Sequence, residues 1–158
     1  MPILEKFYLE SDTVKNEEML PKAHAFNGFG CDGKNETPKI TWKNAPKETK
    51  SFALTVFDPD APTRSGWWHW VVINIPSNVF SSESIPATAL TIRNDYGNKK
   101  FDGACPPIGD KKHRYIFTVF ALKIEKIDIP EDSSPALASF IVNQNIIEKA
   151  EIVAYYQR

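Results

Sequence analysis

Twelve prolines, spread through 158 residues, cut this chain into short segments and leave little room for long helices. Between them run stretches rich in β-branched and aromatic residues, which are typical of strands. The strongest of these stretches cover 51–57, 69–75 and 113–122, and weaker ones cover 39–42 and 89–92. In the first, Phe52, Leu54 and Val56 fall on one face. The second is apolar almost throughout, which predicts a strand buried on both faces. The chain is therefore expected to be all-β or β-rich.

One helix is predicted near the C-terminus. Ser134 can cap it, and Pro135 suits its first turn. Apolar residues at helical spacing continue the pattern to an expected end near Ala150; they are Leu137, Phe140, Ile141 and Ile147. Residues 152–156 are then predicted to form a closing strand. No internal repeat or linker interrupts the chain, so we expect a single domain over residues 1–158.

Charge and hydropathy exclude several classes of protein. The formal net charge is −1, which argues against a nucleic-acid-binding role that depends on broad attraction to phosphates. No apolar run approaches the roughly 20 residues that cross a bilayer, so no stable membrane insertion is expected. Residues 1–6 lack the charged-then-apolar pattern of a signal peptide, and cytoplasmic residence is the resulting expectation.

The two cysteines are Cys31 and Cys105. In a reducing cytosol we expect both to be free thiols, and two are too few for a zinc ribbon. Both lie in segments that contain glycine or proline, so a disulfide between them in an oxidising compartment stays open.

Polar residues gather where the predicted strands end. Asp58 follows the first strand and His69 begins the next, so antiparallel pairing would bring the two close together. On the third strand His113 and Tyr115 share a face, because side chains alternate with period two. Arg114 therefore points the other way, toward structural or surface contacts.

These side chains suit a small oxyanion such as phosphate. A carboxylate beside an imidazole favours the charged imidazolium, and a tyrosine hydroxyl and backbone N–H groups can donate hydrogen bonds. Asp58 would orient and charge a histidine, while Trp67 and the pair 106–107 would form apolar walls. If charged imidazoles hold the anion, affinity should weaken as pH rises through the histidine range.

Other interpretations of the same residues stay open. The run 58–62 is a good turn sequence, and each histidine could be structural. Asp58, His69 and His113 could also form a metal-ligand set, although no metal-binding spacing supports one. No metal, cofactor or catalytic residue is assigned. An enzyme would need Ser65 or Cys105 as nucleophile beside a histidine.

At these residues the chain closely resembles the phosphatidylethanolamine-binding protein family, in its bacterial branch often described as Raf-kinase-inhibitor-like. The resemblance extends from about Phe26 to near the C-terminus. It depends on DPDAP at 58–62, the His-aromatic pair at 69–70, the prolines at 106–107 and HRY at 113–115. The loop at 30–33, with Pro38 and Trp42, is also similar to the bacterial form.

The resemblance implies a mainly β fold, in which a large central antiparallel sheet packs on a smaller sheet, with few short helices. It also implies a pocket for small anions and phosphoryl head groups, with a loop that offers backbone donors. The implied ligand-binding residues are Asp58, Trp67, His69, Gly103, Cys105, Pro106, His113 and Tyr115. A cis peptide bond is expected at Ala61–Pro62 on the same grounds.

Two departures from the family pattern concern the pocket. Position 105 is cysteine where eukaryotic members tend to have glycine, which places thiol chemistry near the site. The chain also ends soon after its last predicted strand, without the longer C-terminal helix that covers the pocket in eukaryotic relatives. A more open pocket is therefore expected.

The leading hypothesis is a non-catalytic binding protein for a small anionic or phosphorylated ligand. The resemblance extends this role to a protein kinase or another signalling protein as partner. The alternative is a hydrolase that uses the His/Asp pocket as general acid and base on a small phosphoester. An aromatic edge at Tyr155 and Tyr156 could support a homodimer.

Overall fold

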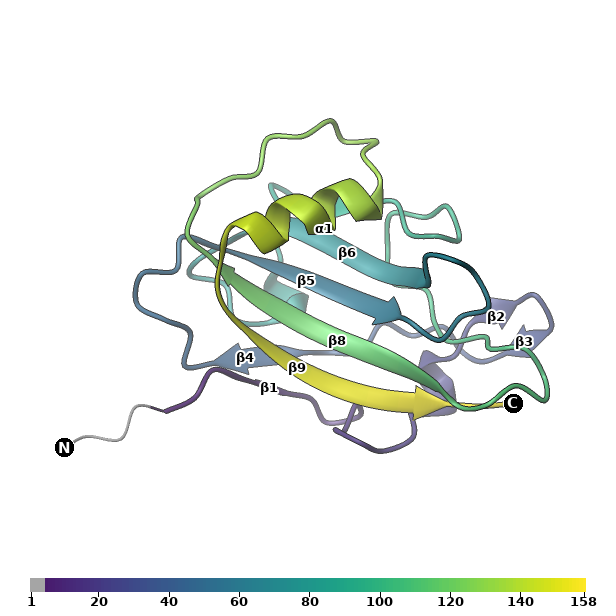
Figure 1. Ribbon diagram of the computed structural model, residues 1–158. Coiled ribbons are helices and arrows are strands. Elements are labelled where there is room, and N and C mark those ends of the chain that lie inside the picture. Colours follow the sequence, from purple (N-terminus) through teal and green to yellow (C-terminus); the bar gives the residue numbers. More distant parts are fainter. Residues whose placement is uncertain (1–4) are drawn as a thin grey trace.

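The computed structural model describes residues 5–158, and its largest unit is a five-stranded antiparallel sheet (Figure 1). The strand order is β7-β6-β5-β8-β9, so β5 lies at the centre. The five strands are β5 (Ser51–Asp58), β6 (Trp67–Pro76), β7 (Leu90–Ile92), β8 (His113–Leu122) and β9 (Ile146–Tyr156). The expected mainly β class and large central antiparallel sheet are confirmed.

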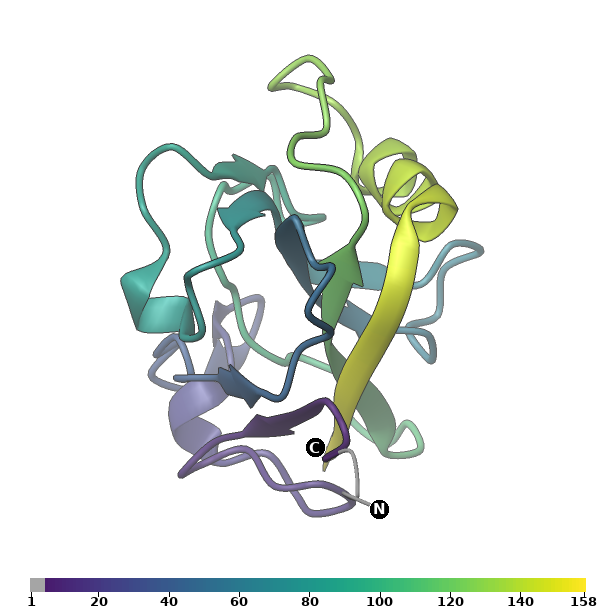
Figure 2. The same ribbon diagram turned by 90° about the vertical axis from the view of Figure 1, so that its left-hand side faces the viewer.

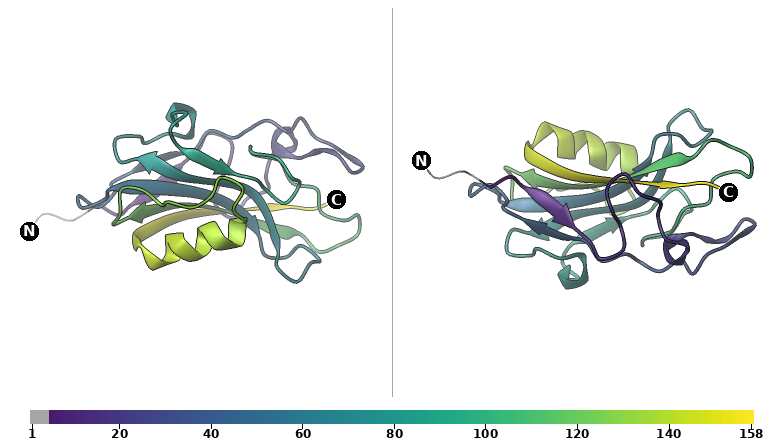
Figure 3. Two further views of the ribbon diagram at one scale, coloured as in Figure 1. Left: turned by 90° about the horizontal axis from the view of Figure 1, so that it is seen from above. Right: turned by 90° about the horizontal axis from the view of Figure 1, so that it is seen from below.

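Smaller elements cover this sheet on both faces. The pair β1 (Tyr8–Glu10) and β4 (Thr41–Lys43) lies on one face and helix α1 (Pro135–Gln144) on the other (Figures 2 and 3). A second pair, β2 (Asn27–Gly28) and β3 (Cys31–Asp32), forms a short hairpin at one end. Single 3₁₀ turns, η1 (Lys22–His24) and η2 (Ser82–Ser84), complete the described elements.

Strand alternation divides the core into two layers. Phe52, Leu54 and Val56 of β5 face the layer that contains Trp42 of β4, as their spacing predicted. Ala53, between them, faces the layer beneath α1. Strand β6 contributes to both layers along its length, which confirms the prediction of a strand buried on both faces.

The C-terminal prediction was wrong about where the helix ends. Helix α1 stops at Gln144, and β9 already begins at Ile146 rather than at residue 152. Residues 146–156 pair with β8 along almost its whole length, and this ladder outweighs the helical spacing in the sequence. The buried side of the helix is made by Ala138 and Val142, whereas Leu137 and Phe140 are exposed.

Ser134 caps α1 as expected, because its side chain accepts a hydrogen bond from the Leu137 N–H at 3.1 Å. We expect Ser134→Ala to lower the free energy of unfolding by about 1 kcal/mol, since the amide loses its partner. Urea denaturation measures this change. Ser139→Ala, within the same helix, is the control and should cost little, because its exposed hydroxyl has only a long 3.4 Å contact with Asn143 Nδ2 and alanine is the better helix former. Equal effects of the two substitutions would contradict the cap.

The aromatic edge at Tyr155 and Tyr156, predicted to support a homodimer, lies at the end of β9, where part of the backbone is already paired within the chain. Residues 17–20 run along β9, with hydrogen bonds from Leu20 N to Tyr155 O at 2.6 Å and from Tyr155 N to Glu18 O at 3.0 Å. The backbone of β9 at this point therefore has an internal partner.

Within the described residues, no helix is long and apolar enough to span a bilayer.

Candidate functional site

A cavity of about 210 Å³ opens at the end of the sheet where β5 finishes and β6 and β8 begin, on the right in Figure 1. Every residue predicted for the site lines it except Gly103. The lining residues are Phe29, Asp58, Ala61, Pro62, Thr63, Trp67, His69, Tyr96, Cys105, Pro106, Pro107, His113 and Tyr115. Sheet register explains the convergence, because Asp58 pairs with Trp67 while β5 also pairs with β8.

His113 lies between two carboxylates. Its Nδ1 donates to Asp58 Oδ2 at 2.7 Å, and its Nε2 donates to Asp110 Oδ2 at 2.8 Å. Both oxygens are acceptors, so both ring nitrogens carry hydrogens and the ring is an imidazolium. Burial lowers the pKa of His113, but the hydrogen bonds that the ring donates to Asp110 and Asp58 outweigh it and hold that pKa above its ordinary value.

This geometry corrects part of the anion hypothesis. Asp58 was expected to orient and charge a histidine, and the hydrogen bond of its Oδ2 identifies that histidine as His113; its other oxygen accepts the Asp60 N–H at 2.7 Å. The two hydrogens of His113 are both committed to protein carboxylates. His113 therefore has no donor left for a ligand, and its charge is balanced within the protein.

His69 is held differently. Its Nδ1 lies 2.8 Å from the carbonyl oxygen of Asp102 and donates to it. Burial lowers the pKa of His69, and the smaller opposing effects of the Asp102 carbonyl and Asp58 do not restore it. The ring is therefore neutral near pH 7, and Nε2 carries a lone pair on the side that lines the cavity.

An amide network behind His69 had not been predicted from the sequence. The buried carboxylate of Asp102 accepts hydrogen bonds of 2.9 Å from Asn35, Asn94 and Asn98. Burial raises the pKa of Asp102, yet these amides keep it below its ordinary value. Asn35 is distant in sequence from the other two, so only the fold reveals that all three share one carboxylate. The network holds the carbonyl that orients His69.

Gly103 belongs to this supporting layer and does not line the cavity. Its N–H donates to Asn35 Oδ1 at 2.7 Å, and its carbonyl accepts from the Tyr96 hydroxyl at 3.0 Å. Within the loop expected to offer backbone donors, the N–H of Gly103 is therefore already committed to Asn35. A Cβ at this position would lie 2.1 Å from the His24 carbonyl oxygen, so close packing requires glycine here.

An aromatic wall, of which the sequence indicated only Trp67, closes one side of the cavity. Tyr96 stacks on Phe26 with ring centroids 4.0 Å apart and on Phe29 at 5.7 Å. Trp67 meets Tyr96 edge-on at 5.3 Å. Phe29 and Tyr96 come from loops with no regular pattern, so nothing in the sequence pointed to them.

Cys31 and Cys105 form a disulfide, so the expectation of free thiols was wrong. The bridge joins hairpin β2–β3 to the 103–107 loop, which includes lining residues of the cavity. Arg158 joins the same two segments, with Nε donating to Pro106 O at 2.6 Å and Nη1 to Gly30 O at 3.2 Å. A disulfide persists in oxidising compartments, which speaks against the cytoplasmic expectation.

Two further expectations concern the loop between β5 and β6. No peptide bond is cis within residues 5–158, so the cis bond expected at Ala61–Pro62 was wrong. Arg114 makes the structural contact that strand alternation suggested, with Nε and Nη2 both 3.0 Å from the Asp60 carboxylate. The hydrogen bonds from Arg114 lower the pKa of Asp60 to about 2. This ion pair fastens the loop to β8.

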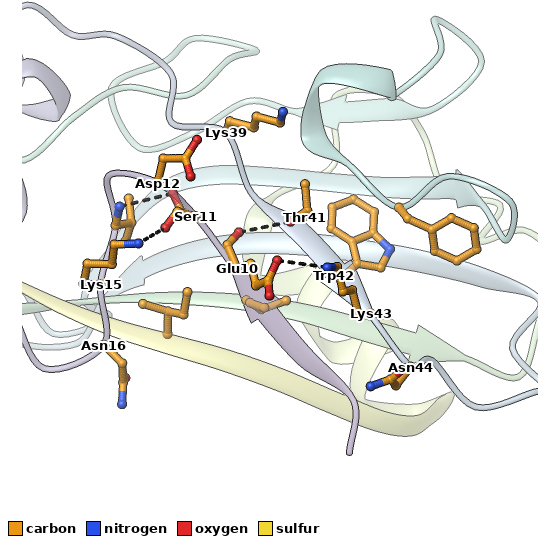
Figure 4. Close-up of a pocket in the computed structure, with 14 residues that line it drawn as sticks. Glu10, Ser11, Asp12, Lys15, Asn16, Lys39, Thr41, Trp42, Lys43 and Asn44 are labelled. Carbon is orange, nitrogen blue, oxygen red and sulfur yellow. Dashed lines mark hydrogen bonds and ion pairs between the residues drawn. The ribbon is translucent and has the colours of Figure 1, made fainter. Parts of the chain in front are cut away.

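A second, larger hollow of about 1020 Å³ lies over β1 and β4 (Figure 4). Its charged side chains are exposed, and Glu10 pairs with Lys43 at 3.2 Å. The described part of the chain contains no group of three or more His, Cys, Asp or Glu side chains that could hold a metal ion. The small cavity is therefore the candidate site, because buried polar groups converge only there among the two hollows.

Comparison with known proteins agrees with the fold and with the sequence motifs. The family model described as phosphatidylethanolamine-binding protein matches residues 10–157. The UPF0098 proteins YbcL and YbhB of Escherichia coli are 48% and 45% identical, over 96% and 94% of this chain and 87% and 98% of their own lengths.

Solved structures give the same result. The crystal structure of Escherichia coli YbcL, described as a member of the mammalian PEBP family, superposes with a TM-score of 0.92 at 47% identity, over 98% of this chain and 99% of that one. A homologue from Chlamydia trachomatis has a TM-score of 0.80 at 29% identity, over 96% and 97% of the two chains. The chain therefore belongs to the phosphatidylethanolamine-binding protein family.

Proposed function

We propose that this protein is a non-catalytic binding protein whose small cavity takes a phosphoryl or similar oxyanion group. One observation supports this most directly. His69 and Tyr115 are only 3% and 2% exposed, both line the cavity, and within residues 5–158 neither His69 Nε2 nor the Tyr115 hydroxyl has a hydrogen-bond partner. Buried polar groups are normally paired, so these two are suited to a ligand.

The walls of the cavity suit the remainder of such a ligand. Trp67, Tyr96 and Pro106 present apolar surface beside the two polar groups. A volume of about 210 Å³ has room for a head group rather than for a large cofactor. A small phosphorylated molecule or the phosphorylated side chain of a partner protein fits this description. Binding of a phosphorylated side chain would allow the protein to modulate a kinase or another signalling protein.

Neither candidate nucleophile supports the hydrolase alternative. Of the two candidate nucleophiles, Cys105 has its sulfur in the disulfide, and Ser65 is not among the residues that line the cavity. His113 has both ring nitrogens engaged by Asp58 and Asp110, so it cannot act as a base without breaking that arrangement.

Calorimetric titration with inorganic phosphate and O-phosphorylethanolamine tests the proposal. We expect Tyr115→Phe to weaken binding about tenfold, because a hydrogen bond to a charged group is lost. Tyr8→Phe, whose hydroxyl bonds Glu10 over the other hollow, is the matched control and should bind like wild type. Absence of binding by wild type, or unchanged binding by Tyr115→Phe, would overturn the proposal.

A further inference from the structure

We propose that the cavity selects an oxyanion that carries a hydrogen, and therefore binds a phosphomonoester as its monoprotonated form in preference to a sulfate ester. His69 Nε2 would accept the hydrogen bond from the P–OH group, and the Tyr115 hydroxyl would donate to another phosphoryl oxygen. This inference rests on the function proposed above and names the class of ligand for the same site.

The first step is the tautomer of His69. The Asp102 carbonyl oxygen, 2.8 Å from Nδ1, can only accept, so Nδ1 carries the hydrogen and Nε2 of the neutral ring is an acceptor. Two hydrogen bonds to the His69 carbonyl oxygen hold the backbone around this contact. Asp102 N donates to His69 O at 3.1 Å, and Asn94 Nδ2 donates to the same oxygen at 3.3 Å. The ring therefore cannot turn to offer its other nitrogen without breaking this arrangement.

The second step is the charge around His69. The carboxylates of Asp58 and Asp95 act on it from β5 and from the 94–102 segment, and the backbone carbonyl of Asp102 accepts its Nδ1–H. Among the residues that line the cavity, His113 is the cation, and Asp58 and Asp110 already neutralise it. Burial keeps the pKa values of Tyr96 and Tyr115 above their ordinary range, so both phenols are neutral. An extra negative charge would therefore find no uncommitted cation among the residues that line the cavity.

The third step compares donors with acceptors. Two groups of lining residues have no partner within residues 5–158: His69 Nε2, which can only accept a hydrogen bond, and the Tyr115 hydroxyl, which can donate one. A monoprotonated phosphomonoester has one donor and several acceptors, which matches this set. A sulfate ester has nearly the same shape and the same charge but no hydrogen, so its oxygen would face the lone pair of Nε2. Sites built to pair a hydrogen-bonding group reject analogues that lack it.

A proton balance follows from this arrangement. At pH 8 a free phosphomonoester is mostly a dianion, because its second pKa is about 6. Binding as the monoanion then takes up about one proton from solvent for each ester bound, and this proton resides on the phosphoryl oxygen that faces His69 Nε2. No bond of the ester is made or broken.

The test compares O-phosphorylethanolamine with ethanolamine O-sulfate, which share one carbon skeleton. We expect wild type at pH 6, where about half of the phosphate ester is already the monoanion, to bind that ester roughly tenfold more tightly. His69→Gln, whose amide can present either a donor or an acceptor, should lose this preference while still binding. Tyr115→Phe should weaken both esters alike.

A second measurement needs no variant at all. Titration of wild type at pH 8 in buffers of different ionisation enthalpy should give uptake of about one proton with the phosphate ester. Equal affinity for the two esters, or no proton uptake, would overturn this inference and leave the binding function standing. Failure of both esters to bind would overturn the binding function as well.

Discussion

Replacing both Cys31 and Cys105 by serine is expected to lower the free energy of unfolding by about 4 kcal/mol. The bridge spans 74 residues of sequence, nearly half the chain. Closing a loop of that length removes a large amount of conformational entropy from the unfolded chain, and the estimate follows from that loss. Most globular domains are stable by only 5–15 kcal/mol, so the loss is a large share of the total.

Urea denaturation of the oxidised protein and of the double variant measures this difference. A reductant should bring wild type down to the stability of the variant and leave the variant itself unchanged. Cys31→Ala with Cys105→Ala is the second control, because it replaces the polar hydroxyls with methyl groups. Equal midpoints for oxidised wild type and both double variants would contradict the prediction.

Asp58→Asn is expected to cost about 3 kcal/mol, because it leaves the buried imidazolium of His113 without its buried counter-charge. Asp58 and His113 are both almost fully buried, and their contact is 2.7 Å. Asp110→Asn is the matched control. Asp110 contacts the other nitrogen of the same ring but is partly exposed, so water can replace it and the cost should be much smaller. A larger loss for Asp110→Asn than for Asp58→Asn would contradict this account.

The contributions of His113 and His69 to stability should change with pH in opposite directions. The folded pKa of His113 is raised, so its contribution is fully present below the unfolded value near 6.5 and is lost as pH rises through the folded pKa. The folded pKa of His69 is lowered, so its contribution is present above about 6.5 and is lost as pH falls. Denaturation of His113→Gln and His69→Gln across pH 5–9 should give opposite trends relative to wild type. Parallel trends would contradict the assignment of charges.

The sequence predicted the strands well because alternation and β-branched runs report burial on a sheet directly. Strands β5, β6 and β8 appear where Phe52–Val56 and their neighbouring runs placed them. The start of β9 could not be predicted, since residues 146–150 also fit a helical spacing. Only pairing with β8, which is not local in sequence, decides between the two.

The candidate site was also predictable from the sequence only in part. Strand ends placed Asp58, His69, His113 and Tyr115 together, because side-chain alternation and antiparallel pairing follow from the sequence pattern. The hydrogen-bond partners of these residues could not be predicted from the sequence. Hydrogen bonds choose between positions a few ångströms apart, and the loop at 94–110, which supplies Asp102 and Asp110, has no periodic pattern to locate it.

The sequence by itself determined the class of fold, the family motifs and which polar side chains gather at one end of the sheet. The tertiary structure alone decided that the cysteines are joined, that His113 is charged and already paired, and that His69 is neutral with an open acceptor. Patterns of hydrophobicity repeat along the chain, so they can be recognised in the sequence. Charge states and disulfide pairing depend on contacts between residues distant in sequence, and those exist only once the chain has folded.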